Sequence, residues 1–305
     1  MQMFSRAGLD FDVRDDGPPD GEVVVLLHGF PETSASWREV TPGLNAAGYR
    51  TLAPDQRGYS PRARPSQRRA YRRRELVADV FALADAARAD RFHLVGHDWG
   101  AAVAWAAAMY DPHRLRTLTT LSVPHPAAFR SALLTSRQAL RSWYMAFFQL
   151  PRLPEALIRT RDWRSLRQNL VRSGLPTSFA ETYVAHLREP GALTGAINWY
   201  RGLRLGDALP IPVSIPTLLI WGSQDAYVHE KGVRLTERYV TGPYRLETLH
   251  GESHWIPEEA PERVVELLLS HLESEQLVKP APVAELRGAS SPRATLPRAA
   301  RPPSS

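Results

Sequence analysis

Short apolar runs that alternate with helical stretches are the feature that most constrains the fold of this 305-residue chain. Each run is long enough for one strand, and residues 23–27 are apolar throughout, as expected of a strand buried on both faces. The predicted strands are residues 23–27, 50–53, 92–95, 115–121, 217–221 and 244–249. The predicted helices are residues 34–47, 75–89, 101–109, 230–239 and 261–272. This alternation predicts an α/β fold, with a mostly parallel sheet and helices on both of its faces.

One long segment interrupts the alternation. Residues 130–205 are helical and aromatic in character and contain no strand candidate. Because ligands of open α/β sheets bind at the carboxyl edge of the strands, we expect this segment to form a helical cap over that edge. The predicted core domain then comprises residues 1–129 and 206–278. Residues 279–305 carry six prolines and little hydrophobic content, which predicts a disordered tail.

The motif with the clearest chemistry follows the predicted strand 92–95. It runs Gly96-His97-Asp98-Trp99-Gly100 and leads into a helix, which is the pattern of a nucleophile elbow with aspartate in place of the commoner serine. Glycine is needed on both sides because a Cβ there would collide with the adjoining strand and helix. The amide of Trp99 is then a candidate oxyanion donor. The alternative is a simple strand-to-helix turn in which Asp98 caps the helix.

Three further positions complete a candidate catalytic set. Phe30, in His28-Gly29-Phe30-Pro31 after the first apolar run, can supply a second oxyanion amide. Asp225 follows the strand at 217–221, and His254 follows the strand at 244–249. The order nucleophile, acid, histidine is the one expected of an α/β-hydrolase.

Several segments resemble the soluble epoxide hydrolases and haloalkane dehalogenases of the α/β-hydrolase superfamily. They are HGFPETSASWR, GHDWGAAVAW, WGSQD and GESHWIPEEAPE, and the resemblance covers residues 8–275. Residues 55–60 also resemble that group's D-x-R-G-x-G/S turn, for which we favour a structural role. The resemblance implies an α/β-hydrolase fold with an inserted cap.

An aspartate nucleophile restricts the substrate. Attack of Asp98 on an ester would give a reactive anhydride, so we expect an sp³ electrophile, either an epoxide or a carbon–halogen bond. Water would then hydrolyse the alkyl ester, with His254 as the base and Asp225 orienting it, while Phe30 and Trp99 hold the oxyanion.

The predicted cap favours the epoxide. Opening an epoxide needs an acid that stays protonated at neutral pH, and tyrosine meets that requirement. Tyr144 and Tyr200 stand in contexts that resemble the ring-opening tyrosines of epoxide hydrolases, although either could be a packing aromatic. We expect Phe30, Pro31, Trp99 and Trp199 to contact the substrate. Phe147, Phe148, Leu150 and Trp163 indicate an apolar one.

Three alternatives stay open. A dehalogenase would use Trp99 and a second indole from Trp143, Trp163 or Trp199 to bind halide, although Phe30 stands where many dehalogenases place a polar residue. Fluoroacetate-type enzymes carry an arginine where this chain has Trp99. The second alternative is another cap-bearing hydrolase, and the third is a catalytically silent binding protein.

Composition excludes several other classes. The chain has no cysteine, which excludes disulfides and thiolate sites, and no cofactor or metal is expected. The net charge of +6 is concentrated in eight arginines within residues 57–74 and in the tail, without a nucleic-acid-binding motif. No apolar run is long enough to span a membrane, and the N-terminus lacks a signal-peptide pattern. We therefore expect a cytoplasmic monomer or homodimer that takes a small apolar epoxide and water, and neither nucleic acid nor membrane.

Overall fold

The computed structural model describes residues 1–202 and 211–277. The predicted tail, residues 279–305, and the predicted junction of cap and core around residue 205 lie outside these residues. No helix in the two described ranges combines the length and apolar character needed to cross a membrane.

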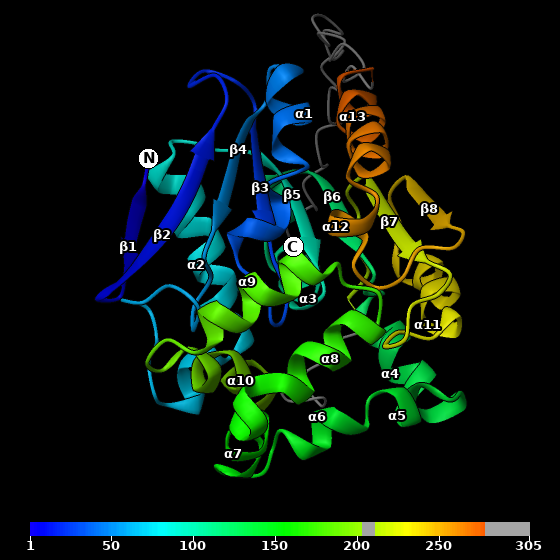
Figure 1. Cartoon of the computed structure of the whole chain (residues 1–305). Coiled ribbons are helices and arrows are strands. Elements are labelled where there is room, and N and C mark those ends of the chain that lie inside the picture. Colours follow the sequence, from blue (N-terminus) through cyan, green and yellow to red (C-terminus); the bar gives the residue numbers. More distant parts are fainter. Residues whose placement is uncertain (203–210, 278–305) are drawn as a thin grey trace, which may run out of the picture.

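The described residues form one eight-stranded sheet with the strand order β1-β2-β4-β3-β5-β6-β7-β8 (Figure 1). The strands from β4 to β8 pair in parallel, whereas β1 and β2 are antiparallel at one edge. Their bounds are β1 Met3–Arg6, β2 Leu9–Asp16, β3 Val23–Leu27, β4 Arg50–Pro54, β5 Phe92–His97, β6 Leu115–Leu121, β7 Thr217–Gly222 and β8 Tyr244–Leu249. The predicted mostly parallel sheet is confirmed.

The two N-terminal strands were not predicted from the sequence. In β2 only Phe11 and Val13 are buried, and polar residues alternate with them because this edge of the sheet is partly exposed. A short, polar, alternating strand lacks the continuous apolar run that marks the central strands.

Helices cover both faces of the sheet. Successive residues of β3 point to opposite faces, so Val24 packs in one hydrophobic cluster and Val25 in the other. One face carries α1 Thr41–Ala46, α12 Ile256–Glu259 and α13 Pro261–Leu277. The opposite face carries α2 Arg73–Ala86, α3 Trp99–Tyr110 and α11 Glu230–Leu235.

The single helix predicted for residues 34–47 is wrong. The chain forms a 3-10 helix at Ser34–Trp37 and then α1. Pro42 lies in the first turn of α1, and a proline removes an amide donor and disfavours helical backbone in the residue before it. The helical spacing is therefore divided between two short helices.

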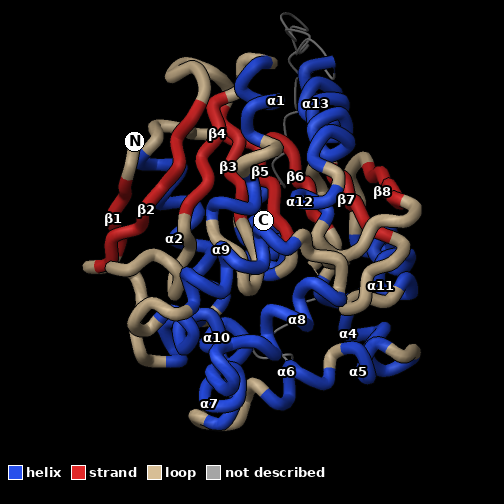
Figure 2. The backbone as a smooth tube through the Cα atoms, viewed as in Figure 1, coloured by secondary structure: helices blue, strands red, loops and turns tan. Residues whose placement is uncertain are grey.

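Between β6 and residue 202 the described chain contains helices and no strand, and they lie below the sheet in Figures 1 and 2. They are α4 Pro126–Thr135, α5 Gln138–Arg141, α6 Trp143–Phe147, α7 Leu153–Arg159, α8 Arg164–Arg172, α9 Thr177–Leu187 and α10 Ala192–Gly202. The central parallel strands end toward these helices, so the loops that follow β3, β5, β7 and β8 meet the helices at one edge. The boundaries of a separate cap at residues 130 and 205 stay predictions.

Candidate active site

Asp98 occupies the sharp turn between β5 and α3. Its backbone has φ 47° and ψ −117°, a conformation that is strained for a residue with a side chain. A Cβ at Gly96 would lie 2.4 Å from the backbone oxygen of Gly100, and one at Gly100 would lie 2.2 Å from the carbonyl oxygen of Leu27. The side chain of Asp98 makes no capping hydrogen bond to α3. The carboxylate therefore lies in the site and does not cap the helix.

The loop after β3 approaches this carboxylate closely. The amide of Phe30 donates to Oδ1 of Asp98 at 2.8 Å, and a Cβ at Gly29 would lie 2.4 Å from the Cβ of Asp98. Trp99 is the first residue of α3, so its amide is one of the N–H groups that a helix leaves unpaired. Both predicted oxyanion donors thus lie next to the predicted nucleophile.

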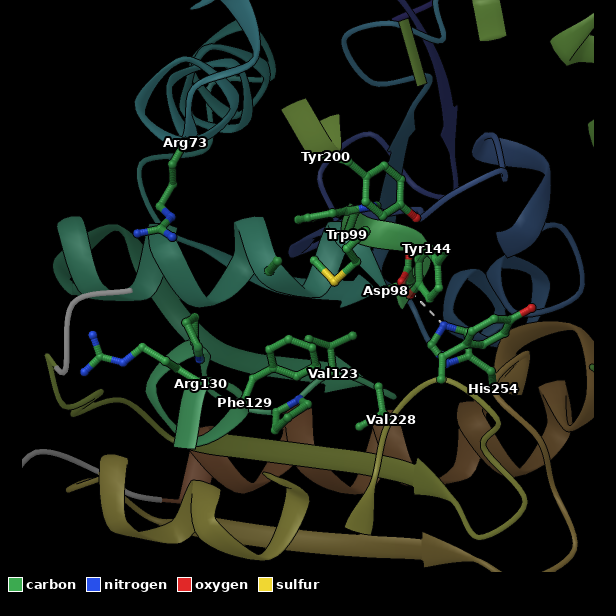
Figure 3. Close-up of a pocket in the computed structure, with 15 residues that line it drawn as sticks. Arg73, Asp98, Trp99, Val123, Phe129, Arg130, Tyr144, Tyr200, Val228 and His254 are labelled. Carbon is green, nitrogen blue, oxygen red and sulfur yellow. Dashed lines mark ion pairs between the residues drawn. The ribbon is translucent and has the colours of Figure 1, made fainter. Parts of the chain in front are cut away.

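His254 lies between two carboxylates. Its Nδ1 is 2.8 Å from Oδ2 of Asp225, and its Nε2 is 3.5 Å from Oδ2 of Asp98 (Figure 3). Oδ1 of Asp225 accepts hydrogen bonds from the amides of Tyr227 and Val228, at 2.7 and 2.9 Å, and its side chain has no exposed surface. The structure therefore brings the three residues together in the order acid, histidine, nucleophile.

Burial and ion pairing compete in setting the pKa of His254. Burial disfavours the imidazolium, but the charges and hydrogen bonds of Asp225 and Asp98 outweigh it and hold the pKa of His254 well above its usual value. Burial alone would raise the pKa of Asp98, but the hydrogen bond and the charge of His254 outweigh it and leave the pKa of that carboxyl lowered. The resting site thus contains an ionised Asp98, as a nucleophile requires.

Two buried side chains hold the backbone of His254, and neither contact was predicted from the sequence. Oγ of Ser122 and Nε2 of His97 each donate to the carbonyl oxygen of His254 at 2.8 Å. Nδ1 of His97 lies 2.7 Å from Oε1 of Glu32, whose other oxygen accepts from the amide of Gly29 at 2.6 Å. The positions of His97, beside the nucleophile, and Ser122, at the end of a strand, were the available signals.

Arg141 of α5 fixes the loop that carries Asp225. Its Nη1 donates to the carbonyl oxygens of Asp225 and Val228, at 2.6 and 2.8 Å. Nothing in the sequence around Arg141 points to this contact, because its partners lie more than 80 positions away along the chain. A helix of the inserted segment therefore positions the acid of the core.

Tyr144 and Tyr200 face the same space as Asp98 and His254 (Figure 3). They come from α6 and α10, and their ring centroids are 5.9 Å apart. Burial is the main cause that raises the pKa of each phenol well above its usual value, and the negative charge of Asp98 adds to it. Both hydroxyls stay protonated throughout the neutral range.

Two cavities meet at these residues. The smaller, of about 120 Å³, runs between α3 and α4 and has apolar walls that include Val123 and Phe129. Arg73 and Arg130 line it on the side away from Asp98 (Figure 3). The larger, of about 630 Å³, passes between the helices α5 to α8. Asp98, Tyr144, Tyr200, Tyr227 and His254 line both.

Tyr227 also lies in the site and was not predicted from the sequence. Its ring centroid lies 5.0 Å from that of His254 and 5.9 Å from that of Tyr144. It follows Asp225 by two positions in the loop after β7, a place from which a side chain reaches the carboxyl edge of the sheet. Burial raises the pKa of this phenol as well.

Phe30, Trp99, Phe147 and Phe148 line one or other cavity as expected. Trp199 does not. Its indole Nε1 donates to the carbonyl oxygen of Arg57 at 2.6 Å, because neighbouring helix residues point about 100° apart and Tyr200 takes the inward direction.

Three other residues that were predicted to face the substrate lie elsewhere. Pro31 is buried outside both linings, and Trp163 is buried beside Arg188. Leu150 is exposed. The turn at residues 55–60 is held by the buried pair of Arg57 with Asp79, which agrees with a structural role. No group of three potential metal ligands occurs among the described residues.

Comparison with known proteins identifies the family of the chain. Residues 22–261 match the model of the α/β-hydrolase fold family. The chain therefore belongs to the α/β-hydrolase family, which confirms the predicted fold.

Within this family, the relatives include proteins named for one activity. The chain is 37% identical over 281 residues to the AB hydrolase superfamily protein YfhM of Bacillus subtilis, with 90% of this chain and 98% of the relative covered. It is 34% identical over 282 residues to Epoxide hydrolase 4 of Mus musculus, with coverage of 88% and 78%. The crystal structure of an epoxide hydrolase of Bacillus megaterium superposes with a TM-score of 0.81 at 27% identity, covering 89% of this chain and 100% of that one.

Proposed function

We propose that the protein hydrolyses apolar epoxides to vicinal diols through a covalent ester on Asp98. The observation that carries this proposal is that two protonated tyrosines, Tyr144 and Tyr200, line the same two cavities as Asp98 and His254. Asp225 pairs with His254 from behind, at 2.8 Å from its Nδ1. The relatives named as epoxide hydrolases support it.

In the first step, a carboxylate oxygen of Asp98 attacks one epoxide carbon and the bond from that carbon to the ring oxygen breaks. Negative charge grows on the ring oxygen, and the hydroxyls of Tyr144 and Tyr200 donate hydrogen bonds and a proton to it. Their raised pKa values keep them protonated until that moment. The product is a hydroxyalkyl ester of Asp98.

In the second step, water attacks the carbonyl carbon of this ester. Esterification removes the charge of Asp98, which is one of the two anions that raise the pKa of His254. This pKa therefore falls, and the neutral imidazole can accept a proton from water. The amide of Phe30, 2.8 Å from Oδ1 in the resting site, and that of Trp99 stabilise the oxyanion. Collapse of the tetrahedral intermediate breaks the ester C–O bond, and the departing alkoxide takes the proton from His254 to complete the diol. The proton that remains on the Asp98 carboxyl returns to the tyrosinate left by the first step, which regenerates the carboxylate and the phenol.

A haloalkane substrate is less well supported. A halide site needs two convergent donors, and Trp99 offers one indole at the nucleophile. Of the other candidates, Trp199 donates to Arg57, Trp163 lines neither cavity, and the side chain of Trp143 is 65% exposed at the rim of the larger one. A silent binding protein would not need the aligned ion pairs of Asp98, His254 and Asp225.

A single-turnover reaction in ¹⁸O-labelled water tests the covalent step. With enzyme in excess over an aryl epoxide, the first diol should carry unlabelled oxygen taken from Asp98, because water attacks the ester carbonyl and not the epoxide carbon. Label in the diol of the first turnover would mean direct attack by water and would overturn the proposed mechanism. Release of bromide from a bromoalkane, without diol from any epoxide, would instead favour a dehalogenase.

A further inference from the structure

Large apolar side chains are exposed on several consecutive helices between β6 and residue 202. Of the ten large hydrophobic residues that are exposed in the described chain, six fall between residues 134 and 157. We call these six the cap patch: Leu134, Leu140, Trp143, Leu150, Leu153 and Leu157. Leu134 is 82% exposed and Leu140 73%, so they pack against little of the protein itself. Exposed apolar groups gathered in this way mark an interaction surface.

Half of the cap patch lines an entrance to the active site. Leu140, Trp143 and Leu157 belong to it and also line the larger cavity, whose inner end is formed by Asp98 and His254. The helices α5, α6 and α7, which carry most of the patch, form the edge of the molecule farthest from the sheet in Figure 1. A flat partner could therefore reach the patch without meeting the core domain.

The charge around the cap patch is strongly positive. Five exposed arginines adjoin it and form no ion pair with any carboxylate in the described part of the chain: Arg137, Arg152, Arg159, Arg161 and Arg164. Residues 130–202 hold eleven arginines against four acidic residues, a net charge of +7. Residues 1–129 and 203–278 together hold 22 basic against 27 acidic residues, a net charge of −5. The segment that forms the entrance is thus positive, whereas the rest of the chain up to residue 278 is negative.

We propose that the cap patch docks on an anionic lipid surface and places the larger cavity against the bilayer. Leucines and a tryptophan would enter the interfacial region, while the surrounding arginines contact lipid phosphates. An apolar substrate dissolved in the bilayer would then reach Asp98 without passing through bulk water. The proposal extends beyond the proposed function, since binding to lipid does not depend on which electrophile the site opens.

Charge favours a lipid partner over a second copy of the chain. A symmetric dimer through the cap patch would bring two surfaces of the same positive sign together, which is unfavourable, whereas an anionic bilayer complements them. The sequence predicted no membrane partner because it contains no spanning segment. A peripheral surface needs none, and this one is assembled from separate short helices that give no amphipathic run.

Vesicle flotation of the full chain tests the proposal. We expect binding to vesicles of phosphatidylcholine mixed with phosphatidylglycerol, weak binding to phosphatidylcholine alone, and a loss of binding at high salt. The double variant Arg152→Glu/Arg164→Glu should weaken binding to anionic vesicles by roughly tenfold or more. Both residues lie at helix N-termini, where glutamate is favourable, so folding should be preserved.

Two matched variants complete the test. Arg14→Glu/Arg88→Glu makes the same charge change at exposed positions of the core and should leave binding near the wild-type level. Leu134→Ser/Leu153→Ser removes two patch residues that line neither cavity, and should reduce binding while hydrolysis of a water-soluble epoxide is unchanged.

Three results would overturn the proposal. The first is no binding to either kind of vesicle, and the second is an equal loss of vesicle binding in Arg14→Glu/Arg88→Glu. The third is a wild-type protein that does not bind lipid but forms a dimer, together with a Leu134→Ser/Leu153→Ser variant that is monomeric. Inactivity toward epoxides with normal vesicle binding would instead count against the proposed function alone.

Discussion

The core and the inserted helices each supply part of the site, but they hold their residues by different means. Asp98 directly follows β5, and Asp225 and His254 lie in the loops after β7 and β8. Each is held by a hydrogen bond of 2.7–2.8 Å that has a backbone group on one side. Tyr144 and Tyr200 instead lie on helices and are held largely by aromatic packing, as in the 4.8 Å contacts of Tyr200 with Trp99 and Phe148. Hydrogen bonds therefore fix the three loop residues, whereas side-chain packing sets the position of the two tyrosines.

Replacement of the core nucleophile should have the largest effect. Asp98→Asn keeps the size of the side chain but removes the nucleophile, so epoxide turnover should fall by about four orders of magnitude or more. Asp111→Asn, at the end of the same helix, is a matched control and should retain activity. Freshly purified Asp98→Asn with near wild-type turnover, after mass spectrometry has excluded deamidation, would end the assignment of Asp98.

Loss of the core base should separate the two half-reactions. His254→Gln should still allow alkylation of Asp98 but should not activate water, so the ester should accumulate. Intact-protein mass spectrometry after mixing with an epoxide should reveal an adduct of the substrate mass. Continued turnover without any adduct would mean that another group is the base.

The cap tyrosines should show graded losses. Each single variant, Tyr144→Phe or Tyr200→Phe, should slow alkylation by about a hundredfold, which corresponds to roughly 3 kcal/mol, and the double variant should be nearly inert. Tyr183→Phe is the control, since Tyr183 is a buried cap tyrosine whose hydroxyl donates to Glu258 at 2.7 Å and not into the site. Equal rates for wild type and the double variant would show that Tyr144 and Tyr200 only pack.

The contact from the inserted helices to the acid loop should matter less. Arg141→Met keeps the side-chain stem but leaves the carbonyl oxygens of Asp225 and Val228 without this donor. We expect turnover about tenfold lower and unfolding easier by roughly 1–3 kcal/mol. Arg137→Met, in the same segment but exposed, should change neither quantity, as thermal unfolding and steady-state kinetics would reveal.

The smallest effect concerns protonation. Asp98→Asn removes one of the two anions that raise the pKa of His254, so this pKa should fall toward its usual value, as NMR titration of the imidazole can measure. The same sign applies to the ester intermediate, in which water activation should be slow below the pKa of His254 and rise as the pH increases through it. An unchanged pKa in Asp98→Asn would mean that Asp98 contributes little to it.

The same contrast explains how far the sequence could be interpreted. Asp98, Asp225 and His254 were predictable because local motifs and chain order specify strand-end residues. Tyr144 and Tyr200 were predicted only through family resemblance, and Trp199 was expected beside the substrate because a helix pattern alone does not say which of two adjacent aromatics faces inward. Ser122 and Arg141 act through contacts between distant positions.

The hydrogen bonds to the carbonyl oxygen of His254 also have a consequence for folding. Their donors, Ser122 and His97, come from the ends of β6 and β5, more than 130 positions before His254 in the chain. Opening the histidine loop therefore means breaking buried hydrogen bonds to residues at the ends of two central strands. We therefore expect the loop of His254 to unfold together with the parallel sheet, as one cooperative unit.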